Sequence, residues 1–296
     1  MNSLMAIASD HGEVGPGAIE RPLDVDPQSG LFGILTCPQS NLKNTGFIFL
    51  NSGLLHRVGP FRLYVDIARR IATSGFPSIR LDLSGKGDSD ALPGVSLADA
   101  NVVDISAACR KLNEETGVRK FVIGGLCSGA DDALQAGLEI DGLAGLFMFD
   151  GYAPKTIRYY IKRYGPKVLS VQSWFKRLHS TTSGRNDPEA EIGSLRNWGT
   201  RRDMLERYDR LVNRGTHILA IFSGWAGNDY VYPSQLITTI GNPQAVSLVS
   251  ELHYPDAAHL FPLSMHRRLA VSGFNDWAEC SFPDAATVEE MNSSQT

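Results

Sequence analysis

The sequence predicts an α/β protein with a mostly parallel, doubly wound sheet and an inserted helical cap. Two observations predict this fold class. Short apolar runs of strand length alternate with helical segments along most of the 296-residue chain, which is typical of parallel strands buried on both faces. One segment, residues 153–212, interrupts the alternation and is rich in tyrosine, tryptophan, arginine and lysine. We interpret that segment as a helical cap inserted between two strands.

The individual strands and helices follow from the pattern of apolar residues. Gly46–Leu50, for example, has no polar side chain, so it fits a strand that is covered on both faces. Helices are predicted where apolar residues recur every three or four positions. The predicted strands are 31–36, 46–50, 77–81, 121–123, 143–149, 217–222 and 249–254, and the predicted helices are 62–74, 96–115, 130–138 and 262–279.

Composition sets the boundaries of the domains. Residues 1–20 and 281–296 are polar or glycine-rich, and we expect both segments to be mobile. The α/β core then comprises residues 21–152 and 213–280, on either side of the 153–212 cap. The cap has thirteen lysines and arginines against six acidic residues. It is therefore either a lid that steers an anionic substrate or a solvated face that balances an acidic core.

The bulk properties exclude several classes of function. A net charge of −4 gives no general case for nucleic-acid binding. The amino terminus lacks the apolar run of a signal peptide, and no stretch is long and apolar enough to span a membrane. Cys37, Cys109, Cys127 and Cys280 are widely spaced, with no metal-like grouping, so we expect free thiols in a reducing compartment. A cytoplasmic protein without a bound metal is expected.

A sharp strand-to-helix turn is predicted at Gly-Leu-Cys-Ser-Gly, residues 125–129. Glycine two positions on either side of Cys127 lets neighbouring backbone pass close to it. The turn would place Cys127 at the amino end of the next helix, where backbone N–H groups favour the thiolate form of a cysteine. Ser128 fits the nucleophile position less well, because Leu126 and Ala130 occupy the positions that need glycine. The alternative is that Cys127 is a small buried apolar residue.

A cysteine nucleophile needs a base within hydrogen-bond reach and an acid behind that base. In a sheet of this kind both partners come from loops after later strands, in the order nucleophile, acid, histidine. His259 follows the last predicted strand, and Asp229 follows the strand before it. We therefore predict a triad of Cys127, His259 and Asp229, with Asp150, which ends an earlier strand, as the alternative acid.

Two backbone N–H groups are also needed to stabilise an oxyanion. The expected donors are those of Ser128, directly after the nucleophile, and Leu54, in the loop after the strand 46–50. Arg57 and His56 in the same loop either reach the substrate or brace the loop, and the bracing role is the one we expect.

Four motifs occur in an ordered set: Asn-Ser-Gly-Leu-Leu-His, Asp-Leu-Ser-Gly-Lys-Gly-Asp-Ser, Gly-Leu-Cys-Ser-Gly-Ala and Asp-Ala-Ala-His-Leu-Phe. On these motifs, residues 30–280 resemble the α/β-hydrolase superfamily, and look most similar to the capped bacterial hydrolases grouped with the serine-aminopeptidase-like enzymes. The resemblance implies acyl-group chemistry through a covalent intermediate, without metal or cofactor. Cys127 departs from the usual serine and is similar to the elbow cysteine of dienelactone hydrolases and polyhydroxyalkanoate synthases.

The expected function is hydrolysis of an ester or thioester through an acyl-cysteine intermediate. The expected partner is a small-molecule acyl substrate, such as a CoA or carrier-protein thioester. An acyltransferase that uses the same intermediate is one alternative, and a non-catalytic ligand-binding protein of the same fold is another. Specificity resides in the site and the cap rather than in the fold. The acyl substrate, the acceptor and the oligomeric state therefore stay open at this point.

Overall fold

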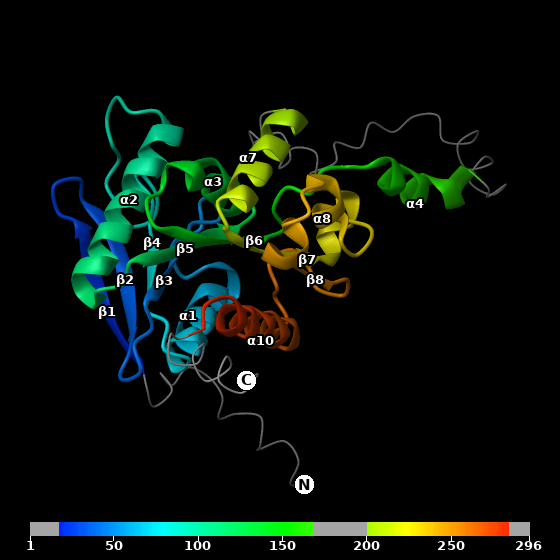
Figure 1. Cartoon of the computed structure of the whole chain (residues 1–296). Coiled ribbons are helices and arrows are strands. Elements are labelled where there is room, and N and C mark those ends of the chain that lie inside the picture. The colour runs from blue at the N-terminus through cyan, green and yellow to red at the C-terminus, as the bar shows by residue number, and fades with distance from the viewer. Residues whose placement is uncertain (1–17, 169–199, 284–296) are drawn as a thin grey trace, which may run out of the picture.

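The structure, a computed structural model, describes residues 18–168 and 200–283 (Figure 1). Its centre is an eight-stranded sheet with the strand order β1-β2-β4-β3-β5-β6-β7-β8. Strand β2 runs antiparallel to both of its neighbours, and β4, β3, β5, β6, β7 and β8 are parallel to one another. The strands are β1 Ala18–Asp26, β2 Leu31–Pro38, β3 Thr45–Leu50, β4 Ser78–Leu81, β5 Lys120–Leu126, β6 Leu143–Phe149, β7 His217–Ser223 and β8 Val249–Tyr254.

Helices cover both faces of this sheet, which confirms the predicted doubly wound fold class. Figure 1 shows α1 and α10 on one face and α2, α3 and α7 on the other. The α-helices are α1 Leu63–Thr73, α2 Leu97–Thr116, α3 Ser128–Ala136, α4 Ile157–Val168, α7 Arg201–Asn213, α8 Gln235–Ile240, α9 Ala245–Leu248 and α10 Ser264–Ser281. Short 3-10 turns are η1 Pro60–Arg62, η2 Gly137–Glu139 and η3 Gly224–Asn228.

An aromatic core holds α1 and α10 against one face of the sheet. Phe274 of α10 packs on three strand phenylalanines, Phe49, Phe147 and Phe149, with ring centroids 5.0–6.3 Å apart. In α10 the buried residues Ala270, Phe274 and Ala278 recur every four positions and form one stripe along the helix. Because both helices lie under the central strands, they fix the carboxyl edge of the sheet, where the loops of interest begin.

Strand β1 was not predicted, and its first three residues, Ala18–Glu20, fall within the segment 1–20. Leu23 and Val25 are buried, while Arg21, Pro22 and Asp24 are exposed. Pro22 is compatible with an edge strand, where one backbone N–H needs no partner. The other seventeen residues of that segment lie outside the described part of the chain, as do residues 284–296 of the predicted tail.

The described ends of the predicted cap differ from each other. Helix α7 buries Met204, Tyr208, Leu211 and Val212 in the core on the α2–α3 face of the sheet. Helix α7 therefore packs on the core as the connection between β6 and β7, although its residues lie within the predicted 153–212 segment. Helix α4 has exposed apolar residues and extends away from the sheet (Figure 1). Residues 169–199, the middle of the predicted cap, lie outside the described residues.

Candidate active site

Cys127 lies at a sharp corner between β5 and α3, as predicted. Its backbone has φ 56° and ψ −116°, a conformation that costs energy in any residue with a side chain. The two flanking glycines permit the close approach of neighbouring backbone. A Cβ atom on Gly125 would lie 2.8 Å from the Leu50 carbonyl oxygen, and one on Gly129 would lie 2.5 Å from the Asn51 carbonyl oxygen. The turn therefore has the geometry of a nucleophile elbow.

Buried contacts hold this elbow in place from below. Tyr64 of α1 is fully buried, and its hydroxyl accepts a hydrogen bond from the Leu126 N–H at 2.6 Å. The Cys127 N–H donates to the Phe149 carbonyl oxygen of β6 at 2.9 Å. Both bonds attach the strained corner to neighbouring elements, so the Cys127 side chain is held at the start of α3.

His259 lies in the loop after β8 and contacts a carboxylate on one side and Cys127 on the other. Its Nδ1 is 2.7 Å from Oδ2 of Asp150, the residue directly after β6. It also forms a side-chain hydrogen bond with Cys127. Because Nδ1 is engaged by Asp150, the other ring nitrogen, Nε2, is the one available to the sulfur.

Asp150 is buried and held by the end of β7. The Ser223 N–H donates to its Oδ1 at 2.7 Å, and the Ser223 hydroxyl donates to its Oδ2 at 2.7 Å. The Asp150 N–H donates to the Ile221 carbonyl oxygen at 2.8 Å. These bonds fix the carboxylate and leave it facing His259, so it can orient the ring and stabilise a positive charge on it.

The electrostatic environment of His259 favours its protonated form. Burial alone would lower the pKa of this histidine, but the hydrogen bonds and charges of Asp150 and Cys127 outweigh burial and raise the pKa to about 9. The imidazole can therefore take a proton from the Cys127 thiol and keep it while a bond to sulfur forms.

Asp229, the acid predicted from the sequence, has a different partner. Its Oδ1 forms an ion pair with Nζ of Lys155 at 2.8 Å. The alternative acid, Asp150, is the carboxylate that contacts His259. The prediction placed the acid on the loop after β7, whereas the carboxylate in contact with His259 lies one strand earlier, directly after β6. We therefore replace Asp229 by Asp150 in the proposed catalytic group.

The two predicted oxyanion donors lie on neighbouring segments. Leu54 is in the loop after β3, and Ser128 is at the amino end of α3. The Gly53 N–H donates to the Ser128 hydroxyl at 2.7 Å, which ties the loop to the helix. The Leu55 N–H closes a turn on the Ser52 carbonyl oxygen at 2.9 Å. Among the described residues, the Leu54 N–H has no hydrogen-bond acceptor, and the Ser128 N–H belongs to the first turn of a helix, which leaves its donors open.

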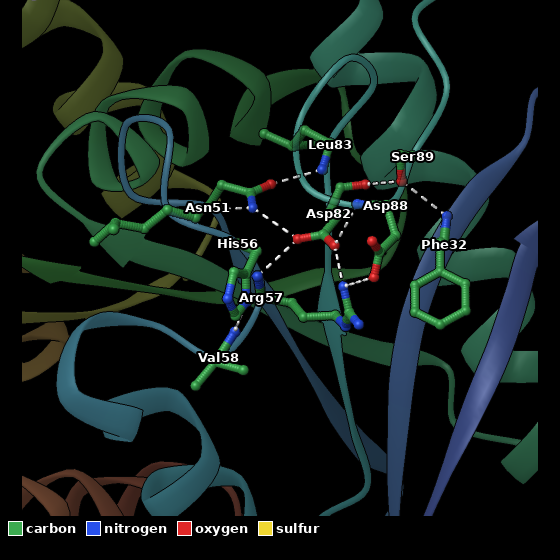
Figure 2. A network of polar contacts seen from close by, with 10 residues as sticks. Phe32, Asn51, His56, Arg57, Val58, Asp82, Leu83, Asp88 and Ser89 are labelled. Carbon is green, nitrogen blue, oxygen red and sulfur yellow. Dashed lines mark hydrogen bonds and ion pairs between the residues drawn. The ribbon is translucent and has the colours of Figure 1, made fainter.

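A buried polar network braces this loop from behind, and Figure 2 shows it at close range. The Asp82 carboxylate is buried and accepts hydrogen bonds from the Arg57 N–H at 2.7 Å and from the Asn51 side chain at 2.9 Å. The Arg57 guanidinium donates to Asp82 at 2.5 Å and pairs with Asp88 at 2.6 Å. Arg57 therefore braces the loop, as expected, while His56 is exposed and its Nδ1 accepts a long hydrogen bond from the Val58 N–H at 3.4 Å.

The other three cysteines are in different environments. Burial raises the pKa of Cys109 to about 12 and also raises the pKa of Cys37, whereas Cys280 is exposed on α10. None of the three is hydrogen bonded to a histidine among the described residues. Within the same residues no group of three His, Cys, Asp or Glu side chains is arranged to hold a metal ion. No helix in that part of the chain has the length and apolarity to cross a membrane.

Two residues at the site were missed in the sequence, Ser223 and Trp225. Ser223 holds Asp150, and the Trp225 ring lies against His259 with centroids 4.1 Å apart. Ser223 ends β7, and Trp225 lies in η3 directly after it. A tryptophan at the carboxyl end of a buried strand was the available signal, because loops there line ligand sites.

Comparisons with known proteins agree with this fold. No protein-family model and no curated protein matches the chain. Among solved structures, it is similar to XC6422 from Xanthomonas campestris, described as an α/β serine hydrolase without a lid, with TM-score 0.55 and 12% identity over 91% of this chain and 97% of that one. The Pyrococcus furiosus esterase PF2001 gives TM-score 0.56 and 13% identity over 89% of this chain and 91% of that one. An esterase of the bacterial hormone-sensitive lipase family gives TM-score 0.56 and 14% identity, with 92% and 87% covered. The chain therefore has the α/β-hydrolase fold.

Proposed function

We propose that this protein cleaves an ester or thioester through an acyl intermediate on Cys127, with His259 as the base and Asp150 as the acid behind it. The observation that carries the proposal is the hydrogen-bonded chain from Asp150 through His259 to Cys127 at the carboxyl edge of the sheet. Structurally similar proteins that are described as esterases or serine hydrolases support the same class of chemistry.

In the acylation step the Cys127 sulfur attacks the substrate carbonyl carbon. The thiol proton passes to Nε2 of His259, and the carbonyl electron pair moves onto oxygen. The N–H groups of Ser128 and Leu54 are the proposed donors to that oxygen. One such donor contributes roughly 3–4 kcal/mol to the transition state in enzymes of this kind. The leaving alcohol or thiol then takes the proton from His259, and the acyl group stays on sulfur.

In the second step a water molecule replaces the leaving group. His259 accepts a proton from the water as its oxygen attacks the acyl carbon. The carbon–sulfur bond breaks, the proton returns to the sulfur, and a carboxylic acid is released. Thioesters are attractive substrates, because exchange between two thiols needs little driving force and leaves the first step nearly balanced. A CoA or carrier-protein thioester is therefore our first choice of acyl donor.

The test is a hydrolysis assay with a panel of acyl thioesters and p-nitrophenyl esters of different chain length. Cys127→Ala should abolish turnover, Cys127→Ser should reduce it, and Cys280→Ala should leave it unchanged because Cys280 lies on α10. Product analysis with added amines and alcohols separates hydrolysis from acyl transfer. Full turnover by Cys127→Ala would contradict the proposal.

A further inference from the structure

The indole ring of Trp225 lies against the imidazole of His259. The two ring centroids are 4.1 Å apart and the ring planes are inclined by 32°, so the rings overlap rather than meet edge to face. Trp225 is half-buried in η3, directly after β7. Its backbone N–H donates to the Ser223 hydroxyl at 3.2 Å, and that hydroxyl donates to Asp150. The indole and the carboxylate are therefore positioned by the same residue.

An aromatic face attracts a cation through its quadrupole, and tryptophan does so most strongly of the aromatic side chains when the charge is within about 6 Å. A neutral imidazole also stacks on an indole, but it lacks this charge term. The contact therefore stabilises the protonated ring more than the neutral ring. It acts in the same direction as the carboxylate on the other side.

The remaining groups around His259 do not reverse this preference. Asp150 and Cys127 contact the ring directly, and both favour its protonated form. The charge of Asp150 also acts on His253 of β8, but burial outweighs it and lowers the pKa of His253, which favours its uncharged form. The ammonium group of Lys155 is paired with the Asp229 carboxylate. Among these groups, no unpaired positive charge competes with an imidazolium.

We propose that Trp225 is a positioning residue that holds the His259 ring between Asp150 and Cys127 and stabilises its protonated state. This inference rests on the proposed function. The proton that leaves the Cys127 sulfur stays on His259 until the leaving group accepts it, so no oxidant or additional reactant is needed. Loss of the indole should lower the proton affinity of His259 and leave its imidazole ring less firmly positioned.

The experiment is a titration of the free protein by NMR with ¹³C-labelled histidine. The His259 signal is assigned by its absence in His259→Gln. Trp225→Leu keeps an apolar side chain without a π face, and Trp225→Phe keeps a weaker π face. In Trp225→Leu the midpoint of His259 should fall by about one pH unit, a tenfold loss of proton affinity that corresponds to ~1.4 kcal/mol. In Trp225→Phe it should fall by less than half as much. The His217 signal is an internal control, because its ring packs on Phe282 instead.

The alternative is that Trp225 only lines the substrate site and has no effect on His259. In that case Trp225→Leu would raise KM and leave the His259 midpoint where it is in the wild type, and the inference would be overturned. Because the titration needs no substrate, an inactive protein with the expected shift contradicts the proposed function and not the inference. If circular dichroism shows that Trp225→Leu does not fold, the smaller shift in Trp225→Phe decides, and an unchanged midpoint there overturns the inference.

Discussion

Nδ1 of His259 lies 2.7 Å from Oδ2 of Asp150, and the acid selected from sequence order, Asp229, is paired with Lys155. The two aspartates therefore form a matched pair of test positions. Asp150→Asn keeps the side-chain shape but removes the charge that orients and stabilises His259. We expect kcat to fall roughly 10³- to 10⁴-fold, the scale seen when a triad aspartate is changed to asparagine. Asp229→Asn should retain kcat within a few-fold. Steady-state kinetics on the best substrate decide, and the reverse ranking would restore Asp229 as the acid.

The pH dependence follows from the raised pKa of His259. In the proposed mechanism the active form has a protonated His259 ring, and this form is lost as the pH rises through the His259 pKa of about 9. We expect kcat/KM to have an alkaline limb with a midpoint near this value and to be maintained below it at neutral pH. Asp150→Asn removes one cause of the raised His259 pKa. The alkaline limb of its residual activity should therefore have its midpoint at a lower pH than in the wild type. A limb that does not move would show that Asp150 has no influence on the ring.

The same pKa makes a prediction about stability. The folded-state pKa of His259, about 9, is above the ordinary histidine value of 6.5. Its protonated ring therefore stabilises the fold fully below pH 6.5, and this contribution is lost as the pH rises through about 9. The free energy of unfolding should therefore decrease between these values more steeply in the wild type than in His259→Gln. Urea unfolding at a series of pH values measures the difference, and parallel curves would contradict the assignment.

Arg57 acts through the loop that carries the proposed oxyanion donor. Arg57→Gln removes two charged contacts of Asp82 and Asp88 and leaves the loop less firmly held. We expect kcat to fall about 10- to 100-fold with a smaller change in KM, because misplacement of a catalytic group by about 1 Å has an effect of this size. His56→Ala in the same loop is the control, since that ring is exposed and its loss removes only a long, uncharged hydrogen bond from the Val58 N–H. Equal effects of the two substitutions would contradict the bracing role.

Glu20 tests whether β1 is integral to the fold. Its carboxylate accepts hydrogen bonds from Arg69 at 2.6 Å and from the buried Arg80 at 2.8 Å. Glu20→Gln leaves Arg80 buried without a counter-charge, and we expect a loss of about 3 kcal/mol in urea unfolding. Burial by itself raises the pKa of Glu20, but Arg69 and Arg80 lower it overall, so the contribution is present above pH 4.5 and is lost on acidification. Glu114→Gln, at an exposed ion pair with Lys111, should cost far less.

The strands and helices could be predicted from the sequence wherever the spacing of apolar residues fitted only one type of element. Strands such as β6, Leu143–Phe149, are continuous apolar runs, and their bounds agree with the prediction. Strand β1 was not predicted because only Ala18, Leu23 and Val25 of its nine residues are buried and because it contains Pro22, which disfavours a strand. The place of helix α7 was not predicted for a different reason. Its sequence is as rich in arginine as the rest of segment 153–212, and only the tertiary contacts of Met204 and Tyr208 show that it packs on the core.

The site was predictable where local chemistry decided it. The glycines around Cys127 impose the corner, and the single histidine on the last strand-to-helix loop leaves one choice of base. The acid was not predictable, because Asp150 and Asp229 both follow parallel strands and only the geometry of the two loops separates them. Ser223 and Trp225 could not be assigned either, since each acts through another residue. Their roles depend on three-dimensional contacts to Asp150 and His259.

The most direct test of the acyl-cysteine is intact-protein mass spectrometry after brief incubation with an acyl thioester and quenching in acid. Peptide mapping then locates the added mass. We predict a gain equal to one acyl group on Cys127 in the wild type and in Cys280→Ala, and none in Cys127→Ala. Turnover of the same thioester with no acyl group on Cys127, or with the group on another residue, would contradict the account.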